Sequence, residues 1–314
     1  RSSDLLIACS IISGRVLAPI GMLPGLTVQW ANAKSALDNL ERMFLLRGDN
    51  HGVEQPVTRE HIRGHLLVQD LSFAYGQGPK VLSLPQWSVS PGERVAVLGL
   101  VGSGKSTLLK LLGGYYAPVS GRVTLDGLDL QHISRDSLSE HIGYLPQDVR
   151  LFSGSLRDNL VSGLVGVSDE VLLQACADGG LMDLIRTHPR GLDLPIGEGG
   201  SGVSGGQRQA VALTRLLLGR PRVWLLDEPT ASMDDGAEIQ AMNAIRKNMR
   251  SNDTLVLVTH KPRLLQLVQR VMVLGPQGVV LDGPRDQVLQ RLQQGPRAAA
   301  DPGIDSAAPI QEAA

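Results

Sequence analysis

The stretch that decides the fold is Gly99-Leu100-Val101-Gly102-Ser103-Gly104-Lys105-Ser106-Thr107. The apolar run Arg94–Leu98 precedes it, and Thr107–Leu112 after it opens a helix, so the order is buried strand, glycine-rich loop, helix. Glycines let consecutive backbone N–H groups turn toward phosphate oxygens, and the helix N-terminus adds partial positive charge. We therefore predict a phosphate-binding loop. Its binding residues are Gly99, Gly102, Ser103, Gly104, Lys105, Ser106 and Thr107.

Two of these residues carry the specific chemistry. Lys105 is expected to reach the β- and γ-phosphates of a nucleotide, and the Ser106 hydroxyl is expected to ligate Mg²⁺. The alternative is a glycine-rich turn that binds nothing. The Lys-Ser pair in a strand-loop-helix context disfavours that alternative.

A second candidate site follows the buried run Val223–Leu226, which ends in Asp227 and Glu228. Open α/β sheets bind their ligands at the carboxyl ends of strands, where these two carboxylates are expected. Asp227 is predicted to hold Mg²⁺, directly or through water, and Glu228 to act as the general base on the attacking water. The alternative is an acidic turn, since Pro229 ends the strand.

Two further polar residues end predicted strands. His260 follows Leu255–Thr259, and Gln147 lies just beyond Ile142–Leu145. At the same sheet edge, His260 is expected to contact the γ-phosphate, and the neutral amide of Gln147 to touch Mg²⁺ and the water. Taken without the other motifs, Gln147 would be a loop residue.

Ser204-Gly205-Gly206-Gln207 completes the set. Ser204 and Gln207 have the S-x-x-Q spacing of a capping box, which predicts the start of a helix that runs through Leu218. A capped helix N-terminus with two glycines is also an anion site.

Read along the chain, seven motifs resemble, in content and order, the nucleotide-binding domain of ATP-binding-cassette (ABC) transporters, from about Leu66 to about Leu289. They are Tyr75, the phosphate loop, Gln147, Ser204–Gln207, Asp227-Glu228, Asp234 and His260. The chain has Val203 where the family usually has leucine before Ser-Gly-Gly-Gln, a conservative apolar change. The resemblance implies that Tyr75 stacks on adenine, although a core strand aromatic sharing a face with Phe73 is the alternative. It also implies a trans contact, in which a second copy of the chain binds the γ-phosphate, and a dimer-interface loop. The residues concerned are Ser204, Gly205, Gly206 and Gln207 for the trans contact and Asp234 for the interface loop.

The expected fold class is α/β, a P-loop NTPase core with a mixed sheet that contains parallel strands. An antiparallel β subdomain is expected from Leu66–Val97 and a helical subdomain from about Asp148–Leu218. Val271–Leu274 and Val279–Leu281, joined by Gly275–Gly278, predict a C-terminal hairpin.

The apolar pattern of the N-terminal segment predicts a helix that spans a membrane and continues beyond it. Leu5–Val28 is mostly apolar with one interior charge, Arg15, and is close to the roughly 20 residues that a bilayer requires. Apolar residues then recur with spacings of four and three as far as Phe44, typical of a packed helical seam. Pro19 and Pro24 weaken the assignment of a span. The expected organisation is the end of a membrane domain (1–48), a polar linker (49–65), the nucleotide-binding domain (66–292) and a disordered tail (293–314).

Composition narrows the partners. The chain has 314 residues and 42% hydrophobic content. Its net charge is −1 and its sequence contains no basic block, so nothing in the composition indicates nucleic-acid binding. Cys9 and Cys176 fit a reducing compartment rather than a disulfide framework. His61 and His65 have helical spacing, but no nearby carboxylate or cysteine cluster supports a metal site.

The leading hypothesis is the ATP-hydrolysing subunit of an ABC exporter half-transporter with ATP and Mg²⁺ as cofactors. Ile12–Pro19 and Ala33–Leu37 resemble the last membrane helix of bacterial type I secretion exporters, which implies protein secretion from the bacterial inner membrane with the ATPase domain on the cytoplasmic side. The implied partners are a second copy in a head-to-tail ATP-sandwich dimer, the chain's own transmembrane domain, the membrane, a periplasmic adaptor and a protein substrate. Alternatives are an exporter of lipid, peptide or drug, a soluble ABC ATPase of DNA repair or translation, and a nucleotide-gated binding module without turnover.

Overall fold

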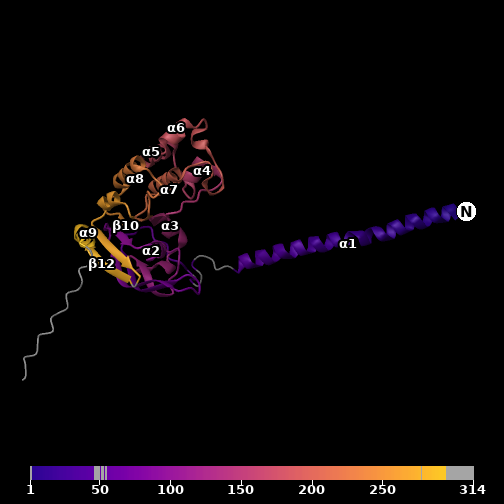
Figure 1. The fold of residues 1–314 in the computed structure, drawn as a ribbon, viewed down its shortest axis with the longest axis horizontal. Helices are drawn as coiled ribbons and strands as arrows, with labels where there is room; N and C mark the ends of the chain where they lie inside the picture. Colours follow the sequence, from indigo (N-terminus) through magenta and orange to yellow (C-terminus); the bar gives the residue numbers. More distant parts are fainter. Residues whose placement is uncertain (1, 46–49, 51–52, 54, 277, 295–314) are drawn as a thin grey trace, which may run out of the picture. The chain divides into compact units, whose positions relative to one another are not determined.

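The computed structural model describes residues 2–45, 50, 53, 55–276 and 278–294 (Figure 1). The chain divides into two compact units, Arg1–Gly52 and Val53–Ala314. Each unit is described by itself. The predicted disordered tail, apart from 293 and 294, lies outside the described residues, as do parts of the predicted linker and Gln277 of the predicted hairpin turn.

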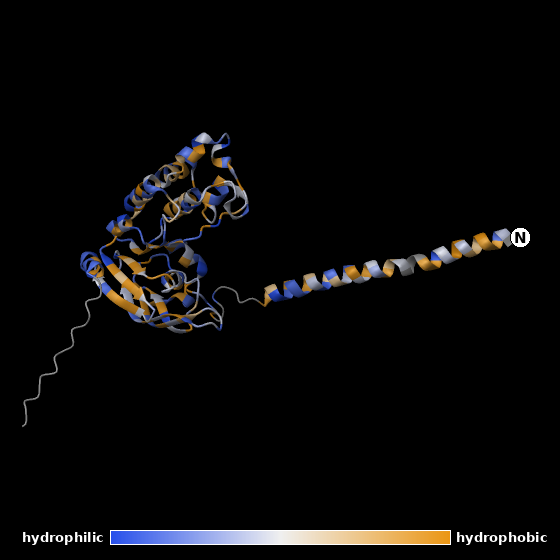
Figure 2. Cartoon of the chain, viewed as in Figure 1, coloured by the Kyte–Doolittle hydropathy of each residue, from blue (hydrophilic) through white to orange (hydrophobic). Residues whose placement is uncertain are grey.

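The first unit is one helix, α1 (Ser2–Phe44). It has the length and composition of a membrane span, with a mean hydropathy of 1.8 in its most apolar window and none of that window buried. Hydrophobic residues recur on both halves of the helix, and hydrophilic ones are most frequent toward its Phe44 end (Figure 2). At 1.5 Å per residue the helix is about 65 Å long, roughly twice the hydrocarbon thickness of a bilayer. The apolar segment and the packed seam expected from the sequence are therefore parts of one continuous helix.

The second unit is built on a six-stranded sheet with the order β12-β11-β3-β10-β9-β6. The five strands from β11 to β6 are parallel, and β12 pairs antiparallel with β11. This confirms the predicted mixed sheet and the C-terminal hairpin. The strands are β3 (Arg94–Gly99), β6 (Ile142–Leu145), β9 (Val223–Asp227), β10 (Thr254–Val258), β11 (Arg270–Gly275) and β12 (Gly278–Pro284).

A second, four-stranded antiparallel sheet has the order β2-β1-β4-β5. Its strands are β1 (Leu66–Ala74), β2 (Lys80–Val89), β4 (Ser120–Leu125) and β5 (Leu128–Asp129). The prediction that this layer comes from Leu66–Val97 was wrong at its C-terminal end and incomplete. Residues 94–97 belong to β3, because a run buried on both faces joins the parallel sheet, and residues 120–129 supply two strands instead.

The predicted helical subdomain is confirmed, and Figure 1 shows its helices gathered in a lobe apart from β12 and α2. It contains α4 (Leu156–Val161), α5 (Asp169–Gly179), α6 (Met182–Thr187), α7 (Gly205–Gly219) and a two-stranded sheet of β7 (Gly154–Ser155) and β8 (Pro195–Ile196). The other helices are α2 (Lys105–Leu112), α3 (Arg135–His141), α8 (Asp235–Asn248) and α9 (Arg285–Gln293). Short 3₁₀ turns lie at Leu130–His132, Gly191–Asp193, Glu198–Gly200 and Pro262–Leu267.

Two apolar cores hold these layers together. One packs α2 between the two sheets, with Leu108, Leu109 and Leu112 fully buried. The other fills the space between the six-stranded sheet and the helices α5, α7 and α8, around Trp224 and Leu213. Loops at the carboxyl ends of β3, β6, β9 and β10 are thereby fixed on well-packed strands.

The segment before β1 contacts the domain. The Asp126 carboxylate, in the turn between β4 and β5, accepts hydrogen bonds from the backbone N–H groups of Arg63 at 2.6 Å and His65 at 2.8 Å. The backbone oxygen of Arg59 lies 2.8 Å from His141 Nε2 on α3, and Val57 forms a β-bridge with Ile133. The described part of the predicted polar linker is therefore anchored at several points.

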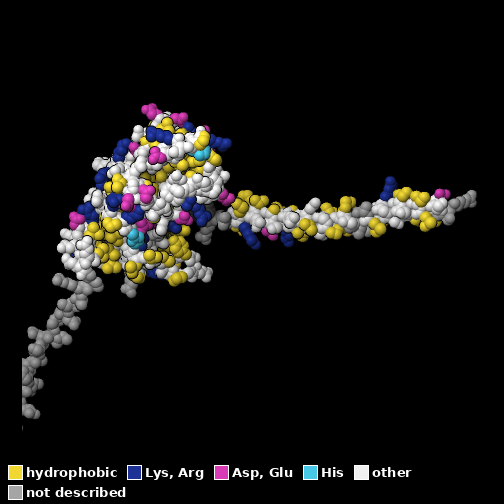
Figure 3. Space-filling model, turned by 45° about the horizontal axis from the view of Figure 1, so that its top comes forward, with side chains coloured by type: hydrophobic (Ala, Val, Ile, Leu, Met, Phe, Trp, Pro, Cys, Tyr) yellow, Lys and Arg dark blue, Asp and Glu magenta, His cyan; other side chains and the backbone are white. Residues whose placement is uncertain are grey.

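Neither sign of charge dominates the face of this unit that Figure 3 presents. Figure 3 shows basic and acidic side chains interspersed on the face that it presents. This agrees with the net charge of −1 for the whole chain.

Candidate nucleotide-binding site

The glycine-rich loop joins β3 to α2 as predicted. Gly104 caps the helix with φ +91°, a left-handed conformation that glycine adopts without strain. Gly99 has φ +155°, and a Cβ atom there would collide with the backbone oxygen of Leu274 on β11. Both positions therefore require glycine for the loop to pass over the sheet edge and turn into α2.

Lys105 is folded back over this loop. Its Nζ donates to the backbone oxygens of Gly99 at 2.9 Å and Leu100 at 2.8 Å. Burial lowers the pKa of Lys105, and the nearby carboxylates of Glu228 and Asp227 oppose that shift. The ammonium group is thus a desolvated cation at the mouth of the loop, where phosphate oxygens would be stronger acceptors than carbonyls.

Asp227 ends β9 beside Ser106 of α2. The residue is only 2% exposed, and among the described residues its Oδ1 atom has no hydrogen-bond partner. Burial raises the pKa of Asp227, while the Ser106 hydrogen bond, Lys110 and Lys105 oppose the rise. A buried carboxylate oxygen without a partner, next to a hydroxyl, fits the oxygen ligands that Mg²⁺ prefers.

Glu228 lies at the carboxyl end of β9 in a strained conformation, with φ +48°. A non-glycine residue in this region costs on the order of 1 kcal/mol, a strain often found at functional positions. The carboxylate lies 3.4 Å from His260 Nε2 and accepts a hydrogen bond from the His260 N–H at 3.4 Å. Burial raises the pKa of Glu228, with the electrostatic and hydrogen-bond effects of His260 opposing it. The structure therefore brings Glu228 and His260 together.

Gln147 lies two residues beyond β6 and is exposed. Strand β6 pairs with β9 so that Leu145 is opposite Leu226, which places Gln147 at the same sheet edge as Asp227. The sequence-predicted residues Lys105, Ser106, Gln147, Asp227, Glu228 and His260 thus share one edge of the sheet.

Tyr75 follows β1 immediately and is 44% exposed, whereas Phe73 is 5% exposed. The two aromatic side chains do not share a buried face, so the alternative of a core aromatic is wrong for Tyr75. Its hydroxyl lies 3.0 Å from Thr107 Oγ1, and its ring meets Phe73 and Tyr116 edge to face at 4.9 and 5.5 Å. Tyr116 was missed from the sequence, although an aromatic pair directly after the helix of a phosphate loop is a usable signal.

Ser204 caps α7 with both halves of the predicted capping box. The Gln207 N–H donates to Ser204 Oγ at 3.2 Å, and the Ser204 N–H donates to Gln207 Oε1 at 2.8 Å. Residues Ser204–Gln207 line a cavity of about 360 Å³ together with Asp234, which caps α8. No residue of the phosphate loop lines this cavity. Ser204 and Asp234 are therefore grouped with each other and not with Lys105.

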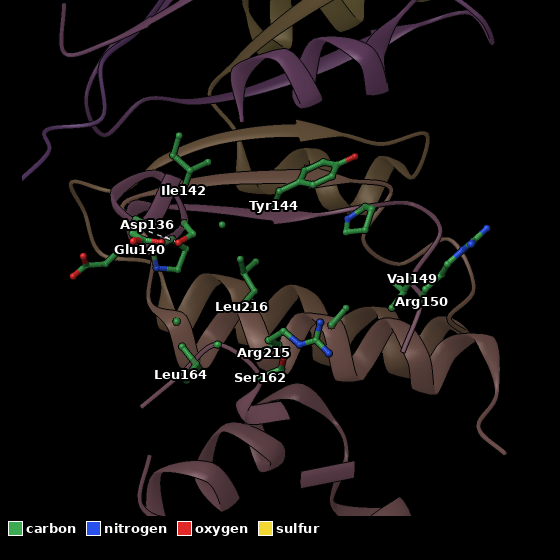
Figure 4. Close-up of a pocket in the computed structure, with 17 residues that line it drawn as sticks. Asp136, Glu140, Ile142, Tyr144, Val149, Arg150, Ser162, Leu164, Arg215 and Leu216 are labelled. Carbon is green, nitrogen blue, oxygen red and sulfur yellow. Dashed lines mark hydrogen bonds between the residues drawn. The ribbon is translucent and has the colours of Figure 1, made fainter. Parts of the chain in front are cut away.

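A larger groove of about 590 Å³ lies between β6 and α7 (Figure 4). Asp136 and Glu140 lie at one end of it, and Arg150 lies toward the other. Arg215 of α7 lines the groove, and its Nε donates to the backbone oxygen of Asn159 at 2.8 Å. This groove faces the helical subdomain and is separate from the site of Asp227 and Glu228.

Replacing the buried carboxylate of Asp227 tests its predicted role in binding Mg²⁺. A carboxyl group whose pKa is raised in the folded state stabilises the fold at low pH, and this contribution is lost as the pH rises through the raised pKa. Asp227→Asn is therefore expected to raise the unfolding free energy of the empty domain at neutral pH by about 0.5–2 kcal/mol. Urea unfolding with and without Mg-ATP should show this gain together with loss of the ligand-induced stabilisation.

The surface variant Asp286→Asn serves as the control and should change neither quantity. A destabilised Asp227→Asn domain, or one that keeps the full magnesium-dependent stabilisation by ATP, would contradict the assignment of Asp227.

Comparisons with known proteins agree with this geometry. Residues 82–231 match the family described as ABC transporter. The type I secretion system ATP-binding protein PrsD of Rhizobium meliloti is 33% identical over 290 residues, covering 92% of this chain and 49% of that protein. The ATP-dependent lipid A-core flippase of Pseudomonas fluorescens is 37% identical over 235 residues, covering 74% of this chain and 39% of that protein.

A solved structure is also similar. A bacterial Atm1-family ABC exporter with ATP bound superimposes with a TM-score of 0.77 at 25% sequence identity, covering 95% of this chain and 53% of that one. The chain spans about half the length of PrsD, and less of the flippase. The unit from Val53 onward therefore contains an ATP-binding ATPase domain of the ABC transporter family.

Proposed function

We propose that this chain is the ATP-hydrolysing part of an ABC exporter half-transporter that works as a pair of copies. The observation that carries the proposal is the division of the motif residues between two places. Lys105, Asp227, Glu228 and His260 share one sheet edge, whereas Ser204 and Asp234 line a separate cavity. A second chain, placed head to tail, would bring its Ser204 to the phosphates held by the first.

The reaction would be attack of water on the γ-phosphorus of ATP, with cleavage of the bond to the β–γ bridging oxygen. Glu228, oriented by His260, would accept a proton from the attacking water. Lys105 and the loop N–H groups would balance charge on the β- and γ-phosphates. Ser106 and Asp227, with Gln147, would hold Mg²⁺, which supplies positive charge to the phosphate oxygens when bound. Tyr75 would stack on adenine.

The pair would convert ATP binding into movement. Two bound ATP molecules would tie the domains together across Ser204–Gln207 and Asp234, and hydrolysis would remove the γ-phosphate contacts that hold them. The groove of Figure 4 would receive a segment of the chain's own membrane domain. Helix α1 would be the last membrane-spanning helix with its cytoplasmic extension, placing the ATPase domain on the cytoplasmic side of a bacterial inner membrane.

Protein secretion is the transport function that we favour. The alignment with PrsD is too long to fit within Val53–Ala314, so it extends into the N-terminal unit. A periplasmic adaptor and a protein substrate would then be partners. Lipid export is a second candidate, because the lipid A-core flippase has a higher identity, 37%, over a shorter alignment of 235 residues. Secretion of a protein, or lipid translocation, by vesicles containing the complete transporter would distinguish the two.

A complementation experiment tests the paired site. Ser204→Ala and Glu228→Gln chains should each have very low ATPase activity as identical pairs, because every site then lacks either the trans serine or the base. When the two variants are co-expressed, random pairing should restore about a quarter of wild-type activity, since mixed pairs contain one complete site. The measurement is phosphate release per chain. Absence of any recovery in mixed pairs that bind ATP would rule out sharing of sites between chains.

A further inference from the structure

Lys261, the residue after His260, is bonded to the loop that joins Glu228 to Asp234. Its Nζ donates to the backbone oxygens of Thr230 at 2.7 Å and Met233 at 3.3 Å. The same nitrogen lies 2.7 Å from Glu238 Oε2. One ammonium group thus contacts the loop at two carbonyls and a carboxylate of the helix that follows it.

Glu238 is a buried carboxylate that the hydrolysis chemistry does not use. It lies on α8, one turn beyond the capping residue Asp234, and is 5% exposed. Arg263 Nη1 lies 3.5 Å from its other oxygen. A buried ion pair is weak evidence for stabilisation of a fold, because desolvation offsets much of the attraction. Its position between the His260 segment and the loop therefore suggests a more specific role.

The same loop is held from its other side by a buried amide. Gln209 of α7 donates through Nε2 to the backbone oxygen of Glu228 at 3.2 Å, and its Oε1 accepts from the Ser232 N–H at 2.8 Å. The loop is thus suspended between the helix that begins at Ser204 and the segment that carries His260. Neither Gln209 nor Lys261 lies within hydrogen-bonding distance of a residue of the phosphate loop among the contacts of the described residues.

We propose that Lys261, paired with Glu238, is a positioning residue that sets the loop from Thr230 to Asp234 for the ATP site of the partner copy. This inference rests on the proposed function, in which paired chains share their sites. Loss of the ammonium group would release two loop carbonyls and shift Asp234, while Lys105 and Asp227 of the same chain would keep their contacts with their own nucleotide. The defect should therefore appear in the partner's site.

Mixed pairs of full chains, isolated through two affinity tags, provide the test. In the reference pair one chain carries Glu228→Gln and the other is wild type, so a single site works. Adding Lys261→Met to the Glu228→Gln chain should lower kcat of the remaining site by about fivefold or more with less than a twofold change in KM for ATP. Unchanged kcat in this pair would overturn the proposal.

Two controls make the result specific. Lys261→Arg, which keeps the charge and the donors, should recover most of the reference kcat. Lys247→Met, on helix α8 like Glu238 but paired with Asp178 at 2.8 Å, should match the reference. If the Lys261→Met chain does not fold, Glu238→Gln replaces it, with the same expected loss and the same overturning result. A reference pair that binds ATP without turnover contradicts the proposed function, whereas an active reference with no effect of Lys261→Met contradicts this inference alone.

Discussion

Glu228→Gln is expected to lower kcat for ATP hydrolysis by about 10²–10⁴-fold, the usual contribution of a general base. Glutamine has the same shape, so the strained backbone at φ +48° and the contact with the His260 N–H can persist. What is lost is the ability to accept a proton from water. ATP affinity should be retained or increased, because the uncharged amide removes a carboxylate from beside the phosphate site. Phosphate release and nucleotide binding, measured on the same preparation, separate the two effects.

The pH dependence gives a second readout for the same variant. Burial raises the pKa of Glu228, so the proton-accepting form is lost at a higher pH than for an ordinary glutamate. Wild-type kcat should therefore fall on the acidic side around that raised pKa, and the residual rate of Glu228→Gln should lack this limb. Glu170→Gln, an exposed change on α5, is the matched control. A Glu228→Gln chain that keeps more than about a tenth of wild-type kcat would require another base.

Local signals made the phosphate loop and its neighbours predictable from the sequence. The run Arg94–Leu98, the glycines and the helix that follows are contiguous, so the chemistry of each residue constrains the next. The capping box of Ser204 and Gln207 is an interaction across three residues and was found for the same reason. Buried apolar runs that end in a polar residue likewise predicted the strand ends at Asp227 and His260.

Features that depend on distant pairing were missed. In β4 the polar and apolar residues alternate only over Arg122–Leu125, which is too short to identify a strand by itself. Its partner β1 lies far away in the chain. Gln209 and Lys261 belong to no spacing pattern that predicts a helix, a strand or a binding motif. Their roles follow from contacts between α7, the loop after β9 and the segment after β10. The roles of such residues depend on which distant segments they contact in the folded chain, and the periodicity of the sequence does not show those contacts.

Lys105→Met is expected to weaken ATP binding by about 10- to 100-fold, equivalent to the roughly 1.5–3 kcal/mol of a hydrogen bond to a charged group. The structure holds Nζ on the oxygens of Gly99 and Leu100, from which it would transfer to the β- and γ-phosphates. Turnover should fall by a further factor of about 10²–10³, because the same charge balances the developing negative charge in the transition state. Titration calorimetry with ATP and single-turnover phosphate release would measure the two losses separately.

Unfolding cannot account for this result if the empty domain keeps its stability. Because burial lowers the pKa of Lys105, charging this group opposes folding, and its replacement by an apolar side chain of similar length should leave the melting temperature of the empty domain nearly unchanged. AMP, which lacks both phosphates that Lys105 would reach, should bind the variant and the wild type equally. Lys80→Met, at an exposed position at the start of β2, should bind ATP as the wild type does. If Lys105→Met binds ATP like the wild type, the predicted role of Lys105 in ATP binding is wrong. The backbone N–H groups of the loop would then bind the phosphates without it, and Lys105 would keep its hydrogen bonds to Gly99 and Leu100 when ATP is bound.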